Sequence, residues 1–225
     1  MHSSGWRMPE IKVVISDPEV KNPRRVKVIA IADPSLPYGE DEKSQKTLPK
    51  ARISPTLKKI LDPQLGVISI GVKKQDGSKV KLVAQIVTDE SMQEGEIRLP
   101  EDFMREKLGV ERALAEVMRA PSFQITLSHE KSSKLYGLKI GDIVDGSIIG
   151  LSGYSLLITG GSDKSGAPML PYIPGPVKKY VLLSGPPGFH PKEEGLRRRK
   201  FVRGNAISED TVQVNTVIVK RPGGK

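Results

Sequence analysis

The sequence predicts a mainly β protein, in which a small β-barrel core of residues 1–27 and 124–225 carries an inserted β domain of residues 28–123 with short helices. Two observations favour this arrangement. Short β-branched runs recur along the chain, separated by turns rich in glycine and proline. Charge is also divided unevenly, because residues 28–123 hold 15 Lys and Arg against 15 Asp and Glu, whereas residues 124–225 hold 15 against 8. A neutral stretch inside a basic chain indicates a separate domain.

Two strands are predicted near the start of the chain. Ile11–Ser16 and Val26–Ala32 are β-branched runs, and each is followed by an Asp-Pro pair that stops a strand. The next segment, Ser35–Lys50, is polar and contains turn-forming proline and glycine, so we expect a loop or linker there.

The middle of the chain contains two similar stretches. Arg52-Ile53-Ser54-Pro55 leads through a short amphipathic segment to Leu65-Gly66-Val67, and Arg98-Leu99-Pro100 leads in the same way to Leu108-Gly109-Val110. Each stretch predicts a strand, then a helix begun by serine or proline, then an exit through Leu-Gly-Val.

Two alternating runs, Val67–Val72 and Lys79–Val87, lie between these stretches and predict strands on either side of a turn at residues 75–78. The whole segment is therefore interpreted as a duplicated strand-helix-strand unit. It resembles the double-psi barrel at the amino terminus of AAA-family unfoldases, in which two such units interlock. The resemblance implies that the inserted domain is a double-psi-like β-barrel.

The last hundred residues are rich in predicted strands. Four are expected, at Ile143–Ile149, Ser155–Thr159, Lys179–Leu183 and Val212–Val219, with glycine and proline between them. Only Lys131–Gly141 suggests a short helix. We expect these strands to form a small closed barrel.

Composition excludes several classes of chemistry. The chain contains no cysteine, and its histidines, His2, His129 and His190, are far apart, so we expect no disulfide, metal or cofactor. No run approaches the roughly 20 apolar residues of a membrane span, and Met1–Pro9 lacks the apolar core of a signal peptide. We expect a cytoplasmic protein, with Met8 as a candidate start of translation.

Basic residues are concentrated near the end of the chain. The net charge of +10 favours a polyanionic partner, although basic enzymes exist as well. Arg197–Lys200 is a run of cations that would repel one another in a loop unless phosphates lay between them, the alternative being a solvated or disordered basic loop. Between Lys164 and Gly204 the only acidic residues are Glu193 and Glu194. The candidate RNA-binding residues are the nine cations of this range: Lys164, Lys178, Lys179, Lys192, Arg197, Arg198, Arg199, Lys200 and Arg203.

Glycines and prolines surround these cations. Gly160-Gly161, Gly166, Gly185 and Gly188 allow the backbone to approach a ligand closely, and the prolines stiffen the loops. Such loops can follow a folded RNA backbone by its shape. The same turn chemistry is also ordinary in β proteins, so this signal is less specific than the charge.

Nothing in the sequence predicts catalysis. Gly185-Pro186-Pro187-Gly188 resembles the start of a nucleotide-binding loop, but Phe189-His190-Pro191-Lys192 follows where Gly-Lys and Ser or Thr are needed. No Gly-x-Ser-x-Gly motif places a serine nucleophile. Aromatic residues make up 4% of the chain, so a stacking platform for bases is not expected. Phe189 and Tyr180 are candidates for single contacts, with core packing favoured for Tyr180.

Many runs of the chain resemble one known family, the archaeal and eukaryotic small-subunit ribosomal protein conventionally numbered six. The matching runs are Val14–Pro18, Gly137–Asp142, Leu157–Gly166, Pro168-Met169, Val181–Gly185, Gly195–Lys200, Val202–Asn205, Gln213–Asn215 and Val217–Val219. The resemblance implies an archaeal member with a large internal insertion, whose core is a β-barrel bound to ribosomal RNA in the lower body of the small subunit. It places the Gly-x-Arg-Arg-Arg-Lys stretch and the Gly-Gly-Ser-Asp-Lys loop against that RNA.

Three hypotheses follow. The leading one is a non-enzymatic subunit of the ribosome that braces folded ribosomal RNA and contacts neighbouring ribosomal proteins. The second is a protein-interaction adaptor tethered to RNA, with the inserted barrel docking an unknown partner. The third, an NTP-dependent enzyme, would require hydrolysis that no motif supports.

Overall fold

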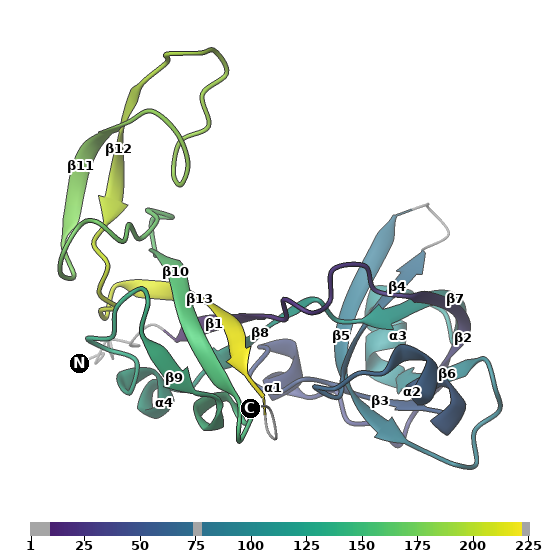
Figure 1. Ribbon diagram of the computed structural model, residues 1–225. Helices are drawn as coiled ribbons and strands as arrows, with labels where there is room; N and C mark the ends of the chain where they lie inside the picture. The colour runs from purple at the N-terminus through teal and green to yellow at the C-terminus, as the bar shows by residue number, and fades with distance from the viewer. Residues whose placement is uncertain (1–9, 74–77, 222–225) are drawn as a thin grey trace, which may run out of the picture. The chain divides into compact units, whose positions relative to one another are not determined.

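The computed structural model describes residues 10–73 and 78–221, and strands dominate its regular structure, which confirms the mainly β prediction (Figure 1). The chain forms two compact units, one of Met1–Ser16 with Gln124–Lys225 and one of Asp17–Phe123. The second unit begins at Asp17 rather than at residue 28, because the strand Arg25–Asp33 belongs to it throughout. The candidate start at Met8 and the predicted turn residues 75–77 lie outside the described residues.

The unit Asp17–Phe123 contains a closed barrel with the strand order β2-β6-β3-β5-β4-β7. Its strands are β2 (Arg25–Asp33), β3 (Lys50–Ile53), β4 (Val67–Lys73), β5 (Lys79–Thr88), β6 (Glu96–Pro100) and β7 (Arg112–Arg119). Its helices are α1 (Glu40–Lys43), α2 (Pro55–Leu61) and α3 (Glu101–Lys107). The helix α1 is a single turn within the segment where only a loop was expected.

The barrel consists of two interlocked copies of one unit. Exchanging β2-β3-α2-β4 with β5-β6-α3-β7 maps the strand order of the barrel onto itself. In each copy the first strand runs parallel to the second strand of the other copy, as β2 does with β6 and β5 with β3. This is the topology of a double-psi barrel, so both the duplication and the double-psi prediction are confirmed.

Local sequence explains why each copy turns from strand to helix. Pro55 stands in the first turn of α2, and the side chain of Ser54 accepts a hydrogen bond from the backbone N–H of Leu57 at 3.3 Å. Leu57 and Leu61, four residues apart, face the barrel and are buried. The barrel interior itself is aliphatic, filled by fully buried side chains such as those of Ile53, Ile70, Ile97 and Leu99.

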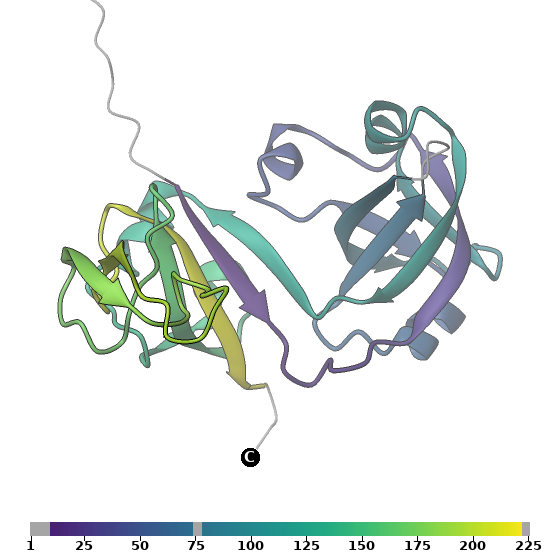
Figure 2. The ribbon, with the colours of Figure 1, turned by 90° about the horizontal axis from the view of Figure 1, so that it is seen from above.

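The unit that contains both ends of the chain is built on an open sheet with the order β8-β1-β13-β10-β9. Its strands are β1 (Ile11–Ser16), β8 (Ser122–Leu127), β9 (Ile143–Asp145), β10 (Ser155–Asp163) and β13 (Thr211–Lys220). β1 lies parallel to β13, so the first and last strands of the chain are neighbours (Figure 2). β8 begins two residues before the boundary between the units.

Three predictions for this unit are wrong in part. The strand expected at Ile143–Ile149 ends at Asp145, whose side chain accepts a hydrogen bond from the Ser147 N–H and starts the 3₁₀ helix η1 (Gly146–Ile149). Because β9 is so short and lies at an edge, the sheet does not close into the expected small barrel. The helix expected over Lys131–Gly141 is only α4 (His129–Ser133). After it, the N–H groups of Leu135 and Tyr136 donate to carbonyls three residues earlier, as in turns, and Gly137 has a positive φ of 84°.

A separate two-stranded ribbon belongs to the same unit. It consists of β11 (Lys178–Leu183) and β12 (Arg198–Arg203), which are antiparallel and are joined by the long loop of residues 184–197 (Figure 1). The strand β12 was not predicted. One face of the ribbon packs on a small core made of Leu170, Ile173, Leu183, Phe189 and Val202.

In the described part of the chain, no helix is both long and apolar enough to cross a membrane.

Candidate nucleic-acid interface

The register of β11 and β12 assigns their side chains to two faces. Residues directly opposite one another share a face, and successive residues alternate between faces. Leu183 and Val202 therefore belong to the inner face, which covers the small core. The outer face presents Tyr180, Leu182 and Phe201, each more than half exposed.

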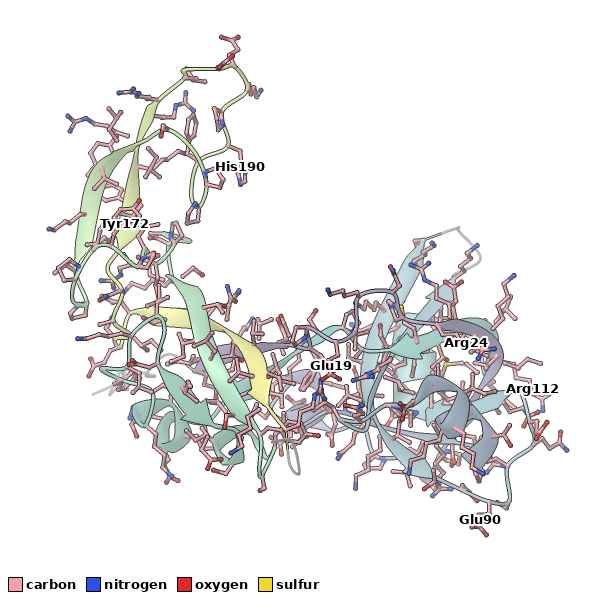
Figure 3. The ribbon with its side chains drawn as sticks, in the orientation of Figure 1. Glu19, Arg24, Glu90, Arg112, Tyr172 and His190 are labelled. Carbon is pink, nitrogen blue, oxygen red and sulfur yellow. The ribbon has the colours of Figure 1, made fainter. Side chains whose placement is uncertain are left out.

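Six of the predicted cations stand exposed on this ribbon and its loop. They are Lys179, Lys192, Arg197, Arg198, Arg199 and Lys200. Across residues 10–73 and 78–221, the ion pairs of this region involve only Lys164, Lys178 and Arg203 among the predicted cations. Figure 3 shows side chains standing out along the ribbon and its loop, where His190 is labelled.

These six cations repel one another. Arg198 and Lys200 lie on the same face of β12 and are about 6.6 Å apart along the strand, which is less than the Debye length of about 8 Å at physiological salt. Salt therefore leaves part of the repulsion between Arg198 and Lys200 in place. A phosphate chain lying along them would remove it.

The base of the ribbon is held by a buried carboxylate. Asp163, at the end of β10, lies 3.1 Å from the Nζ of Lys178 and 3.4 Å from the Nε of Arg203. Arg203 also forms a short ion pair with Asp210, and its Nη1 donates a hydrogen bond to the carbonyl of Pro176. Lys164 lies 3.5 Å from Asp210 and remains largely exposed. Lys178 and Arg203 are thus engaged within the protein.

Asp163 is stabilised in its charged form. Burial alone would raise its pKa, but hydrogen bonds from Ser165, Ala167 and Lys178 outweigh burial and lower the pKa to about 2. The contacts include the Ser165 N–H at 2.9 Å, the Ser165 hydroxyl at 2.7 Å and the Ala167 N–H at 2.8 Å. The carboxylate therefore stays negative and keeps the two cations in place.

A glycine completes the base of the ribbon. A Cβ built on Gly204 would come within 1.9 Å of the carbonyl oxygen of Gly175. The Gly204 N–H donates to Val177, and the Asn205 N–H donates to Ile173. Only glycine permits this close backbone packing directly after β12.

Two aromatic residues have the reverse of the expected environments. Tyr180 is 53% exposed on the outer face of the ribbon, whereas core packing was favoured for it. Phe189, expected to contact a partner, is 7% exposed because it folds back onto Leu170 and its neighbours. Sequence alone did not show that β11 has only one covered face.

The barrel holds its cations differently. Arg52 and Arg98 stand opposite each other on β3 and β6, and both lie near Asp33, at 3.3 and 3.9 Å. Burial raises the pKa of Asp33, but hydrogen bonds from Ser35 together with these arginines lower it overall. Asp89 occupies the equivalent place in the second copy and pairs with Arg52 at 3.9 Å.

A sequence signal for both clusters was present but missed. Asp33-x-Ser35, Asp89-x-Ser91 and Asp163-x-Ser165 share the spacing Asp-x-Ser. In each case the aspartate accepts hydrogen bonds from the N–H and the hydroxyl of the serine. The motif marks a carboxylate fixed at a strand end, and Asp145-x-Ser147 at the end of β9 shares it. The cationic partners of Asp33, Asp89 and Asp163 come from other strands of the fold.

Fold and charge together define a class: a basic, β-rich protein with a charge-balanced barrel and a ribbon whose exposed cations suit a polyanion. The family model described as "Ribosomal protein S6e" matches residues 111–225. A "Small ribosomal subunit protein eS6" from Hyperthermus butylicus is 50% identical over 213 residues, which cover 94% of this chain and 98% of the relative. The chain therefore belongs to the eS6 family of small ribosomal subunit proteins, as its sequence predicted.

Further relatives agree. Proteins of the same description from Staphylothermus marinus and Saccharolobus islandicus are 43% and 41% identical, covering 94% and 95% of this chain and 99% and 100% of the relatives. Among solved structures, two designed proteins titled msDPBB_sym2 and mkDPBB_sym1 are 20% and 24% identical, cover 43% of this chain and 100% of their own, and have a TM-score of 0.29.

The barrel is shared with the archaeal relatives. The family match begins at residue 111 and so leaves most of the barrel outside it. Alignments over 94% or 95% of the chain, however, omit far fewer residues than Asp17–Phe123 contains. The relatives therefore carry a counterpart of the barrel.

Proposed function

We propose that this protein is a structural constituent of the small ribosomal subunit, where its ribbon braces folded ribosomal RNA without catalysing a reaction. Membership of the eS6 family supports the subunit as its location. The observation that carries the RNA contact is the set of six exposed cations on β11, β12 and their loop, to which no carboxylate of the described residues is paired.

The contacts follow from the chemistry of each side chain. Arg197, Arg198 and Arg199 offer planar guanidinium forks that bind phosphate oxygens in pairs, whereas Lys179 and Lys200 act as point charges. Each phosphate neutralised releases condensed counterions, so binding weakens steeply as salt rises. Lys192 and Lys164 extend the surface at the loop and at the base. Lys178 and Arg203 hold the ribbon in place.

The distribution over two faces explains why the ribbon would brace RNA rather than lie against one helix. Arg198, Lys200 and Lys179 remain exposed although they share the inner face of the ribbon with the core residues Leu183 and Val202. Arg199 lies on the outer face. Cations on both faces can neutralise RNA strands on either side. A ribbon inserted between two RNA segments holds them at a fixed separation.

The proposal is tested by assembly. A full-length variant with Arg197, Arg198, Arg199 and Lys200 changed to Ala is compared with one in which exposed barrel cations Lys58, Lys59, Lys79 and Lys81 are changed to Ala. Both lose the same charge. We expect the ribbon variant to fail to co-sediment with archaeal small subunits while the barrel variant still does. Equal co-sedimentation of both variants would overturn the proposal.

A second candidate function is the adaptor, and one observation favours it. Ile29 and Leu114 stand opposite each other on β2 and β7, on the outside of the barrel, and are 48% and 63% exposed. If the barrel docks a protein there, Leu114→Asp would reduce incorporation into the subunit without changing affinity for naked ribosomal RNA. Under the leading proposal, Leu114→Asp changes neither quantity.

A further inference from the structure

The outer face of the ribbon carries an exposed aromatic pair. Tyr180 and Phe201 are directly opposite in the register, with ring centroids 4.7 Å apart and ring planes inclined at 42°. Their side chains are 53% and 56% exposed, and Leu182 beside them is 55% exposed. The pair therefore presents much of its ring surface to solvent instead of to the small core.

This apolar surface lies in the most cationic part of the molecule. Of the large apolar side chains that are exposed among the described residues, half lie between Tyr172 and Phe201. The Nζ of Lys178 is 5.4 Å from the ring centroid of Phe201, and Arg199 shares the outer face opposite Leu182. Exposed aromatic rings next to cations are the combination that binds nucleic acid bases while neutralising their phosphates.

We propose that Tyr180 and Phe201 form a stacking site for an unpaired base of the ribosomal RNA that the ribbon contacts. The inference rests on the proposed function and adds to it a preference for unpaired nucleotides. A base stacks on the ring surface, and Arg199 binds a phosphate beside it. Lys178 adds positive electrostatic potential at the rings, and its ion pair with Asp163 partly neutralises that potential.

The neighbouring charges decide against other occupants. Arginine and aromatic residues are enriched at the cores of protein interfaces, but lysine is depleted there. Here the Nζ of Lys178 lies 5.4 Å from the ring centroid of Phe201, and the exposed cations Arg198, Arg199 and Lys200 adjoin the rings, so the face favours an anionic partner. A continuous RNA helix cannot use the site either, because its bases are already stacked on one another. An unpaired nucleotide can stack its base on the rings and place its phosphate beside the cations.

The test uses the full chain and two RNA probes of equal length. One is a single-stranded oligonucleotide containing 2-aminopurine, whose fluorescence falls when the base stacks, and the other is a fully paired duplex. We expect the double variant Tyr180→Val and Phe201→Val to bind the single strand about tenfold more weakly and to lose the quenching. Affinity for the duplex and the salt slope stay unchanged, because no phosphate contact is removed.

Two controls define the aromatic contribution. Leu114→Val removes part of a similarly exposed apolar side chain from the barrel, and we expect no change with either probe. The exchange of Tyr180→Phe with Phe201→Tyr retains two rings, and we expect both affinity and quenching to persist. Valine favours strands, so the double valine variant keeps the ribbon paired.

Three results would overturn the inference. Equal loss of affinity for both probes would mean that the ring pair only stabilises the ribbon. Unchanged affinity for both probes would show that no base stacks there. Reduced incorporation into subunits with unchanged RNA affinity would assign the face to a protein. In each case the effect of Arg197–Lys200 on RNA binding is measured separately, so the failure of the stacking site is distinguishable from failure of the proposed function.

Discussion

The arginines of the barrel unit and the cations of the ribbon differ in whether they form ion pairs within the protein. The unit Asp17–Phe123 contains 19 Lys and Arg against 17 Asp and Glu, and five of its seven arginines pair with carboxylates, as Arg52 does with Asp33 and Arg119 with Asp17. Residues 178–203 contain 8 Lys and Arg against 2 Glu, and most of these cations are exposed and unpaired in the described residues. Charge therefore stabilises the first region, whereas in the second it supports the proposal of a polyanionic partner.

The largest expected effect separates an arginine that holds the ribbon from one that stabilises only the barrel unit. Arg203→Ala leaves Asp163 buried without its guanidinium partner, so we expect the free energy of unfolding to fall by about 3 kcal/mol. Arg119→Ala is the matched variant in the barrel, because Asp17 is equally buried and lies 2.8 Å away. Denaturant titration should show similar losses for both variants. RNA binding should weaken only for Arg203→Ala, and weakening by both would contradict the separation.

The second largest effect is expected from acid, which should lower the free energy of unfolding by removing the charge of Asp163 at the base of the ribbon. The pKa of Asp163 is lowered from 3.8 to about 2 in the folded protein, so its contribution is complete above pH 4 and is lost as pH falls through 2. The shift corresponds to about 2 kcal/mol. Unfolding measured between pH 5 and pH 2 should show this loss. Asp163→Asn should flatten that part of the pH profile, and an unaltered profile would contradict the assignment.

A smaller effect is expected from the geometry of the guanidinium group. Arg197→Lys keeps the charge but loses the fork that binds two phosphate oxygens, so RNA affinity should fall by about 1 kcal/mol, roughly fivefold. The salt slope should not change. Lys200→Arg is the reverse substitution and should not weaken binding. Equal affinity of Arg197→Lys and the unsubstituted protein would indicate a purely electrostatic contact.

The smallest effect is expected at the surface of the barrel. Arg105 pairs with Glu101 one turn earlier in α3, and its side chain is 70% exposed. Arg105→Ala should lower the free energy of unfolding by about 0.3 kcal/mol and leave RNA binding unchanged. A loss of RNA affinity here would show that the barrel also contributes to the interface.

Local patterns predicted much of the fold. β1, β2, β4 and β5 have β-branched or alternating sequences, and Ser54-Pro55 begins α2 as expected. Duplication of a short motif was enough to predict the interlocked barrel, because both copies carry the same helix start and the same exit.

The remaining features depend on contacts between distant residues. Arg198-Arg199-Lys200 has no apolar alternation, and its strand forms because β11 pairs with it. The sequence predicts Arg203 as an RNA contact but does not show that Asp163 and Asp210 reach it. Phe189 is buried only because the loop folds back onto the small core.

The central claim is that the cations of the ribbon, and not the net charge of the protein, bind the RNA. Its most direct test is binding to archaeal small-subunit ribosomal RNA across a salt series, with the Arg197–Lys200 alanine variant beside the variant of Lys58, Lys59, Lys79 and Lys81. For the ribbon variant, the negative slope of log K against log salt should become shallower by about 3 units, because each lost phosphate contact removes about 0.7–0.9 from its magnitude. The barrel variant should keep the slope of the unsubstituted protein. An equal reduction in both variants would contradict the claim and assign binding to net charge alone.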